Sequence, residues 1–206
     1  MSGQDLIVQQ APVPAARLIL LFHGVGARPE DLVPLGRTLA AADPAAWVVS
    51  VCSPAACDLG RGWQWFSVRG VTEDNRPARI AEALPQFMRT VRDWQARAGV
   101  KLAGTTLIGF SQGAIMAPES TQLPESVAAR VISLAGRFAS PPRVAPMATQ
   151  VHLLHGDQDP VIDSRHSLTA AETLRSLGAA VTVERFPGLG HGVDSRMAAR
   201  VRALAA

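Results

Sequence analysis

The sequence LIGFSQGA at residues 107–114 decides how this chain is expected to fold. An apolar run typical of a buried strand leads into Gly109-Phe110-Ser111-Gln112-Gly113, and a segment able to form a helix follows. At a sharp turn from strand to helix, glycines two residues on either side of the serine remove the Cβ atoms that would collide with the neighbouring backbone. Ser111 is therefore the candidate nucleophile, with an ordinary glycine-rich turn as the alternative explanation of the same pattern.

Apolar runs rich in β-branched residues recur along the chain and alternate with segments of helical periodicity. Most of these runs are too continuous for a sheet with one face in water, so we expect buried parallel strands. The expected strands are 17–22, 47–51, 105–110, 130–134, 151–154 and 181–186, and the expected helices are 30–41, 77–98, 111–120, 163–177 and 195–205. Pro85 is expected to kink or divide the longest helix. The pattern predicts an α/β fold with a mostly parallel central sheet and helices on both faces.

Length and composition favour one globular domain over residues 1–206, because 48% of the residues are hydrophobic and 18% are charged. The net charge is only +3, and the basic residues are scattered among 17 acidic ones, so nucleic-acid binding is not expected. There is no cationic leader, and no apolar run approaches the ~20 residues that cross a membrane. We therefore expect a cytoplasmic protein without a membrane partner, with Cys52 and Cys57 as reduced thiols and no metal-ligand spacing around them.

A serine nucleophile needs a histidine and a carboxylate, and the second half of the chain offers both. His191 lies in the sequence GLGHG, after the last expected strand and at the sheet edge where ligands bind in open α/β folds. It is the candidate general base, the alternative being a histidine in a surface loop. In HGDQDPVI, residues 155–162, we choose Asp159 as the acid, because Asp157 beside glycine is expected to hydrogen-bond to its own turn. The order Ser111, Asp159, His191 is that of α/β hydrolases.

The sequence FHGVG at residues 22–26 is expected to form part of an oxyanion hole. A loop that follows an early strand can turn its backbone N–H groups toward a developing oxyanion. Val25 is expected to provide one N–H donor and Gln112 the other, while His23 holds the loop by hydrogen bonding. His152, His155 and His166 are expected to have structural roles.

Two irregular segments are expected to shape the substrate cleft. The first, residues 53–75, carries Trp63, Trp65 and Phe66, and a loop of this length is usually functional. Its aromatic side chains are expected to line the cleft, with packing against the core as the alternative. The second, residues 136–149, is rich in proline and too short to contain a lid domain, so an open cleft is expected.

Together these motifs resemble those of the phospholipase/carboxylesterase family of α/β hydrolases, which includes the acyl-protein thioesterases. The matching stretches are LFHGVG at 21–26, WFS at 65–67, TEDNR at 72–76, GFSQGA at 109–114, HG at 155–156, DPVI at 159–162 and GH at 190–191. The resemblance implies an α/β-hydrolase fold with a catalytic triad of Ser111, Asp159 and His191. It also implies oxyanion donors at Val25 and Gln112 and an aromatic segment, Trp65-Phe66, beside the site. Ser67 departs from the pattern, since the thioesterase relatives usually carry Asp after Trp-Phe, so their action on acylated proteins is not carried over.

The expected activity is that of a serine esterase that uses no cofactor or metal and hydrolyses short- to medium-chain carboxylic esters through an acyl-enzyme. A thioesterase would need the same machinery and differ only in its cleft. A non-catalytic binding protein on a hydrolase fold is disfavoured, because all three triad positions are present. The expected partner is a small-molecule ester, and a homodimer is the one protein assembly left open.

Overall fold

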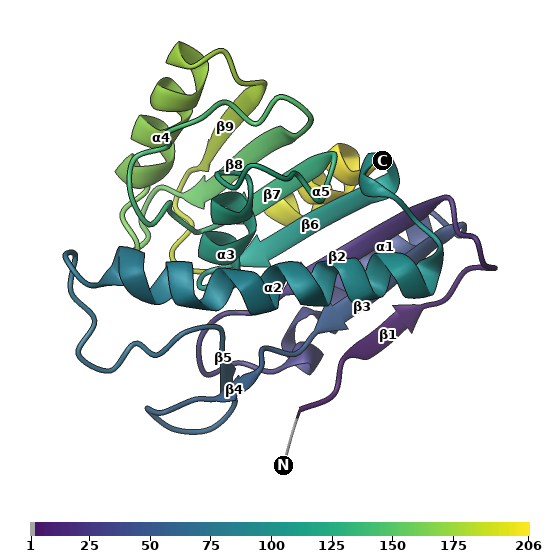
Figure 1. Ribbon diagram of the computed structural model, residues 1–206. Coiled ribbons are helices and arrows are strands. Elements are labelled where there is room, and N and C mark those ends of the chain that lie inside the picture. Colours follow the sequence, from purple (N-terminus) through teal and green to yellow (C-terminus); the bar gives the residue numbers. More distant parts are fainter. Residues whose placement is uncertain (1–2) are drawn as a thin grey trace.

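The computed structural model describes residues 3–206 and has a seven-stranded sheet at its centre (Figure 1). The spatial order is β1-β3-β2-β6-β7-β8-β9. These strands are β1 (Leu6–Gln9), β2 (Arg17–Phe22), β3 (Ala46–Val51), β6 (Thr105–Phe110), β7 (Arg130–Leu134), β8 (Gln150–Gly156) and β9 (Val181–Phe186). All pairs are parallel except β1 with β3. The expected mostly parallel sheet is therefore confirmed, and each of the six expected strands is present.

Strand β1 was not predicted, because its four residues are too few to give a clear periodicity. It pairs antiparallel with one edge of β3, and the register shifts between Ile7 and Gln9. The amide of Gln9 donates to the carbonyls of Asp43 and Ala46 at 2.8 Å each, which ties β1 to the start of β3. Local sequence periodicity does not predict such contacts between distant segments.

Helices cover both faces of the sheet, as predicted (Figure 1). They are α1 (Val33–Ala42), α2 (Arg76–Ala98), α3 (Gly113–Ser120), α4 (Arg165–Ser176) and α5 (Ser195–Ala205), with short 3-10 turns at Pro29–Leu32 and Leu102–Gly104. Side chains of a strand alternate between its two faces. In β2, Leu18, Leu20 and Phe22 join the core under α2 and α3, whereas Ile19 and Leu21 join the core under α1 and α5. Helix α4 packs on Val151 and Leu153 of β8.

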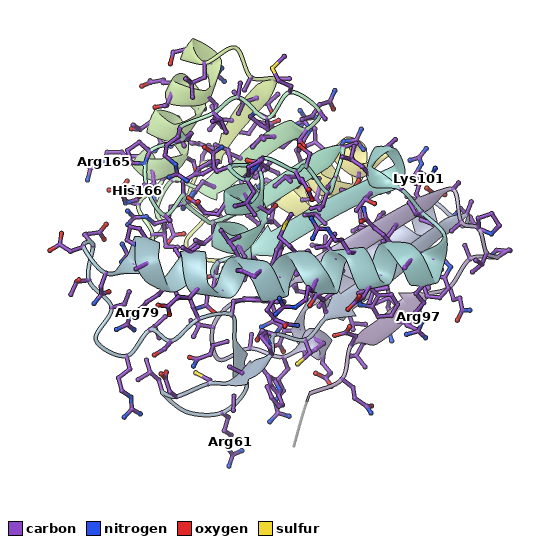
Figure 2. All side chains as sticks on the ribbon, in the orientation of Figure 1. Arg61, Arg79, Arg97, Lys101, Arg165 and His166 are labelled. Atoms are coloured by element: carbon purple, nitrogen blue, oxygen red, sulfur yellow. The ribbon has the colours of Figure 1, made fainter. Side chains whose placement is uncertain are left out.

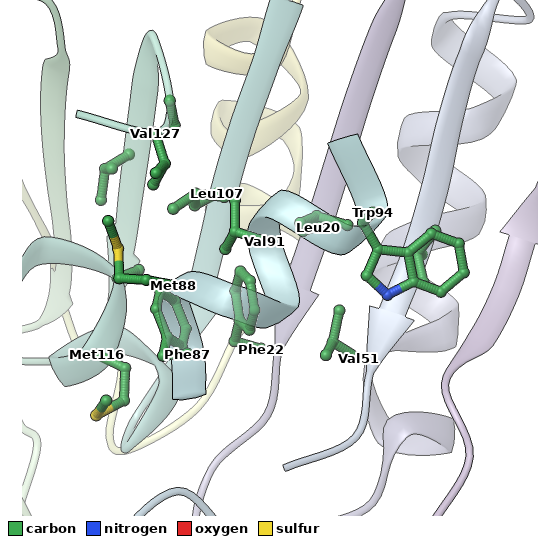
Figure 3. Close-up of a cluster of buried hydrophobic side chains, with 14 of the residues drawn as sticks. Leu20, Phe22, Val51, Phe87, Met88, Val91, Trp94, Leu107, Met116 and Val127 are labelled. Atoms are coloured by element: carbon green, nitrogen blue, oxygen red, sulfur yellow. The ribbon is translucent and has the colours of Figure 1, made fainter. Parts of the chain in front are cut away.

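Helix α2 is continuous through Pro85. Pro85 lies on the exposed side, where water can bond to the carbonyl that the missing N–H leaves free. The opposite side carries an apolar stripe, which gives this segment its helical periodicity and is formed by Ile80, Leu84, Phe87, Val91 and Trp94. Figure 3 shows Phe87, Val91 and Trp94 against side chains of the sheet.

The two irregular segments lie at the carboxyl end of the sheet. Residues 53–75 contain a hairpin of two-residue strands, β4 (Ala55–Ala56) and β5 (Trp63–Gln64). Residues 136–149 run from β7 to β8 without a helix. Within residues 3–206 no lid domain is present, in agreement with the open cleft expected from the sequence. In the same part of the chain, no helix combines the length and apolarity needed to cross a membrane.

Candidate active site

Ser111 lies in a strained turn between β6 and α3. Its φ is 52°, a left-handed conformation that non-glycine residues rarely adopt, and its N–H donates to the carbonyl of Leu134 at 3.0 Å. The flanking glycines allow this turn because, without a Cβ atom, neighbouring backbone segments can approach them closely. A Cβ at Gly109 would collide with the backbone of Gly113, and a Cβ at Gly113 would collide with the carbonyl of Phe22. The predicted strand–turn–helix context of Ser111 is therefore present.

His191 lies between Ser111 and Asp159. Its Nε2 is 2.9 Å from Ser111 Oγ, and its Nδ1 is 2.7 Å from Asp159 Oδ2. Since an ionised carboxylate only accepts hydrogen bonds, Nδ1 carries the proton and Nε2 can accept the proton of the serine hydroxyl. The three residues follow β6, β8 and β9, in loops at the carboxyl end of the sheet. The sequence-predicted Ser111, Asp159 and His191 are thus brought into one hydrogen-bonded chain.

The carboxylate of Asp159 has no exposed surface and accepts hydrogen bonds on both oxygens. Its Oδ1 accepts from the backbone N–H of Val161 at 2.8 Å and of Ile162 at 3.0 Å. Burial alone would raise the pKa of this carboxyl, but the hydrogen bonds from His191 and from these two N–H groups outweigh it, and the pKa is lowered. Asp159 is therefore ionised and fixed in orientation.

His155, expected to have a packing or turn role, also contacts Asp159. Its fully buried Nε2 lies 2.8 Å from the carbonyl of Ile162 and 3.1 Å from Asp159 Oδ2, so this nitrogen is the donor. Its Nδ1 accepts from the hydroxyl of Ser167 at 2.8 Å. Burial lowers the pKa of His155, which keeps the ring neutral. Two histidines thus donate to the same carboxylate oxygen, and only the position of His155 just before the Asp157/Asp159 pair could have suggested this.

Asp157 does not reach His191. Its Oδ1 accepts from the backbone N–H of Gly188 at 2.7 Å, which connects the loop after β8 to the loop that carries His191. The sequence prediction placed this hydrogen bond within its own turn, and the structure corrects it. The acceptor role was expected, but the partner lies 31 residues away in the chain.

The loop after β2 is held in place on both sides of Val25. His23 is buried, donates from Nδ1 to the carbonyl of Gly24 at 2.7 Å and accepts at Nε2 from the N–H of Ser53 at 3.1 Å. Beyond Val25, the N–H of Gly26 donates to the carbonyl of Trp63 at 2.8 Å. Among residues 3–206, the backbone N–H groups of Val25 and Gln112 have no hydrogen-bond partner, and both residues line the cavity that contains Ser111.

Of the three aromatics expected to line the cleft, Trp63, Trp65 and Phe66, only Phe66 lines that cavity. Trp65 is 4% exposed and packs against Phe22 and Phe87, with its Nε1 donating to the carbonyl of His23 at 2.9 Å. The expectation that Trp65 lines the cleft is therefore corrected, because its indole lies in the core beneath the loop after β2. The side chain of Gln112 holds this segment, since it accepts from the N–H of Trp65 and donates to the carbonyl of Phe66, both at 2.7 Å.

The cavity next to Ser111 has a volume of about 530 Å³ and two chemically different parts. Its apolar wall is formed by Val25, Phe66, Val68, Val71, Ile115 and Val161. Charged side chains of Glu73, Arg76 and Arg137 line it as well. A chain of carbon atoms fits the first part, and the second part can bind polar groups.

This fold and site define an α/β hydrolase with a serine, histidine and aspartate in hydrogen-bond contact. The profile of the family described as "Phospholipase/Carboxylesterase" matches residues 4–204, and the chain belongs to this family. It is 47% identical over 196 residues to "Esterase YpfH" of Escherichia coli (strain K12), covering 95% of this chain and 84% of that protein. The family predicted from the sequence motifs is therefore confirmed.

Solved structures agree with this assignment. The crystal structure of esterase PE8 is 29% identical, with a TM-score of 0.86, and the match covers 98% of this chain and 96% of that one. The carboxylesterase of Bacillus cereus has a TM-score of 0.82 at 18% identity, covers 100% of this chain and 93% of its own, and shows the shared fold. At the level of enzyme class, the prediction of a carboxylesterase is confirmed.

Proposed function

We propose that this enzyme hydrolyses short- to medium-chain carboxylic esters through an acyl-enzyme formed on Ser111. The observation that carries the proposal is the hydrogen-bonded chain from Ser111 Oγ through His191 to Asp159, with distances of 2.9 and 2.7 Å. The cavity of about 530 Å³ beside it is open and partly apolar, which suits an acyl chain of limited length. Residues 1–206 act as one domain in this proposal, because loops of one sheet supply all three side chains.

In the first half-reaction, Ser111 Oγ bonds to the carbonyl carbon while His191 Nε2 takes the hydroxyl proton. The electron pair of the C=O bond moves onto oxygen, and the N–H groups of Val25 and Gln112 donate to this oxyanion. The intermediate then breaks its bond to the alcohol oxygen, which receives the proton from His191. The acyl group remains as an ester of Ser111.

In the second half-reaction, water attacks the acyl carbon and gives a proton to His191. The second tetrahedral intermediate breaks the bond to Ser111 Oγ, the proton returns to the serine, and a carboxylic acid leaves. Asp159 holds His191 with the proton on Nδ1 and stabilises the imidazolium formed in each half-reaction.

The test is hydrolysis of p-nitrophenyl esters from acetate to palmitate, with acyl-CoA thioesters of the same chain lengths measured in parallel. We expect the highest kcat/KM among the shorter esters. Ser111→Ala should fold normally and lose turnover by up to about 10⁶, as removal of a triad serine does elsewhere. A fluorophosphonate should label wild-type Ser111. Hydrolysis of thioesters alone would contradict the ester assignment, and labelling of another residue would contradict the assignment of the nucleophile.

A further inference from the structure

The charged part of the cavity contains two arginines that share one carboxylate. Arg137 forms a bidentate pair with Glu73, with Nη1–Oε1 3.1 Å and Nη2–Oε2 2.8 Å. Arg76, the first residue of α2, donates from Nη1 to Glu73 Oε1 at 2.5 Å. The side chains of Arg76 and Arg137 are only 17% and 15% exposed, so both are held in the wall rather than free in solvent.

This group of three side chains carries one net positive charge. The two hydrogen-bonded arginines lower the pKa of Glu73 to about 2, so its carboxylate is ionised at every pH at which the enzyme would be assayed. Among residues 3–206, the Nε and Nη2 groups of Arg76 have no hydrogen-bond acceptor, whereas all three nitrogens of the Arg137 guanidinium have one. Arg76 therefore has unused donors.

Within residues 3–206, neither of the other carboxylates that line the cavity bonds to Arg76. Asp159 is held by His191, and Asp163 pairs with Arg165 at 2.6 Å. His166, labelled beside Arg165 in Figure 2, has its pKa lowered by burial and by Arg137, which favours the neutral ring. The same cavity thus has Ser111, an apolar wall and, on Arg76, a guanidinium with free donors.

We propose that the preferred substrate is an ester that also carries an anionic oxygen group, such as a carboxylate or phosphate, which binds Arg76 next to the Arg137–Glu73 pair. The inference rests on the proposed esterase function of the same site. A planar guanidinium with free donors recognises such oxygens by charge-assisted hydrogen bonds. The apolar wall would contact the carbon chain between the scissile carbonyl at Ser111 and the anionic group.

The experiment compares matched pairs of esters by proton release. Ethyl hexanoate is paired with ethyl hydrogen adipate, which has the same acyl length and a terminal carboxylate, within a series of half-esters from succinate to suberate. A second pair, butyryl glycerol and butyryl glycerol 3-phosphate, tests a phosphate on the alcohol side. For each pair, the measured quantity is the ratio of kcat/KM for the anionic ester to that for the neutral ester.

We expect the wild-type ratio to exceed one for at least one pair and to fall as salt is added. Arg76→Gln should lower this ratio by about 10-fold or more, the scale of a hydrogen bond to a charged group. Arg137→Gln should lower it as well, and Glu73→Gln should raise it, because the balancing negative charge is lost. The control is Arg92→Gln, which removes another ion-paired arginine of α2 that does not line the cavity and should leave the ratio unchanged.

Arg137→Gln breaks three hydrogen bonds and can fail to fold, in which case Arg76→Gln and Glu73→Gln decide the question. Preference of the wild type for the neutral ester in every pair would overturn the inference, as would a ratio that neither Arg76→Gln nor Glu73→Gln changes. In both cases, neutral esters would still be hydrolysed in a Ser111-dependent manner. Absence of Ser111-dependent hydrolysis of every ester would overturn the proposed function, and the inference with it.

Discussion

At the scale of single residues, Asp159 shows how a buried carboxylate is kept charged. Each of its oxygens accepts two hydrogen bonds, from Val161 and Ile162 on Oδ1 and from His191 and His155 on Oδ2. A buried charge without such partners would cost several kcal/mol. Because every acceptor direction is used, the carboxylate has no freedom to rotate away from His191.

We expect Asp159→Asn to lower kcat by about 10⁴, because the amide can no longer hold His191 with its proton on Nδ1. Asp157→Asn is the matched control, since its contact is with Gly188 and not with His191. It should cost far less. Steady-state kinetics on one soluble ester would measure both, and a larger loss for Asp157→Asn would contradict our choice between the two aspartates.

At the scale of elements, the turn between β6 and α3 is packed against the end of β2. The N–H of Gly113 donates to the carbonyl of His23 at 3.1 Å, so the start of α3 and the loop carrying Val25 are in direct contact. All eight residues of α3 are buried. A small displacement at Gly113 would therefore change the position of Gln112 relative to Val25.

Gly113→Ala should destabilise the protein by about 1–3 kcal/mol, because the added Cβ meets the backbone of Phe22 and neither strand nor helix can yield without loss of packing. The kcat of the folded variant should also fall, because displacement of α3 from the end of β2 separates the two oxyanion donors, the N–H groups of Val25 and Gln112. Gly60→Ala is the control, because nothing lies within 4 Å of its Cβ position, and it should change stability by less than about 0.5 kcal/mol. Urea denaturation would measure the free energy of unfolding of both variants. Equal losses for Gly113→Ala and Gly60→Ala would contradict the explanation by packing against Phe22.

At the scale of the whole molecule, all candidate catalytic groups lie in loops at the carboxyl end of one sheet, and no lid domain covers them within residues 3–206. A lidded lipase is activated at an oil–water interface because the interface stabilises its open state. Without a closed state to release, the enzyme should gain nothing from an interface.

Turnover is expected to follow ordinary saturation on soluble esters, with no jump when a short-chain triglyceride exceeds its solubility. The measurement is initial rate against substrate concentration across the solubility limit. An abrupt increase in rate would show that residues 53–75 act as a mobile cover, which would contradict the open-cleft description.

Stability of the whole molecule should decrease in acid because several histidines are buried. Burial lowers the pKa of His23 and His155, and lowers that of His152 from 6.5 to about 4. Between its folded and unfolded pKa values, such a histidine binds more protons in the unfolded chain, so stability rises with pH across that window. For His152 the window runs from about pH 4 to 6.5, and the slope is at most ~1.4 kcal/mol per pH unit.

Urea denaturation at several pH values should therefore show a free energy of unfolding that falls as the pH is lowered from about 6.5 to about 4. The lowered pKa values of Asp159 and Glu73 act in the same direction at still lower pH, where these carboxylates become protonated. His152→Gln should reduce the slope between about pH 4 and 6.5. An unchanged slope would show that His152 does not contribute to the pH dependence of the free energy of unfolding.

The sequence by itself determined six strands of the central sheet, the five helices and the candidate triad, because these depend on short patterns. The six predicted strands and the turn around Ser111 are each specified by fewer than ten neighbouring residues. Only the tertiary structure decided that Trp65 belongs to the core, that His155 contacts Asp159, and that Glu73 joins Arg137 across 64 positions of the chain. The contacts of Trp65 and Glu73 join distant segments, which no local pattern contains, and the contact of His155 depends on the conformation of the turn that joins it to Asp159.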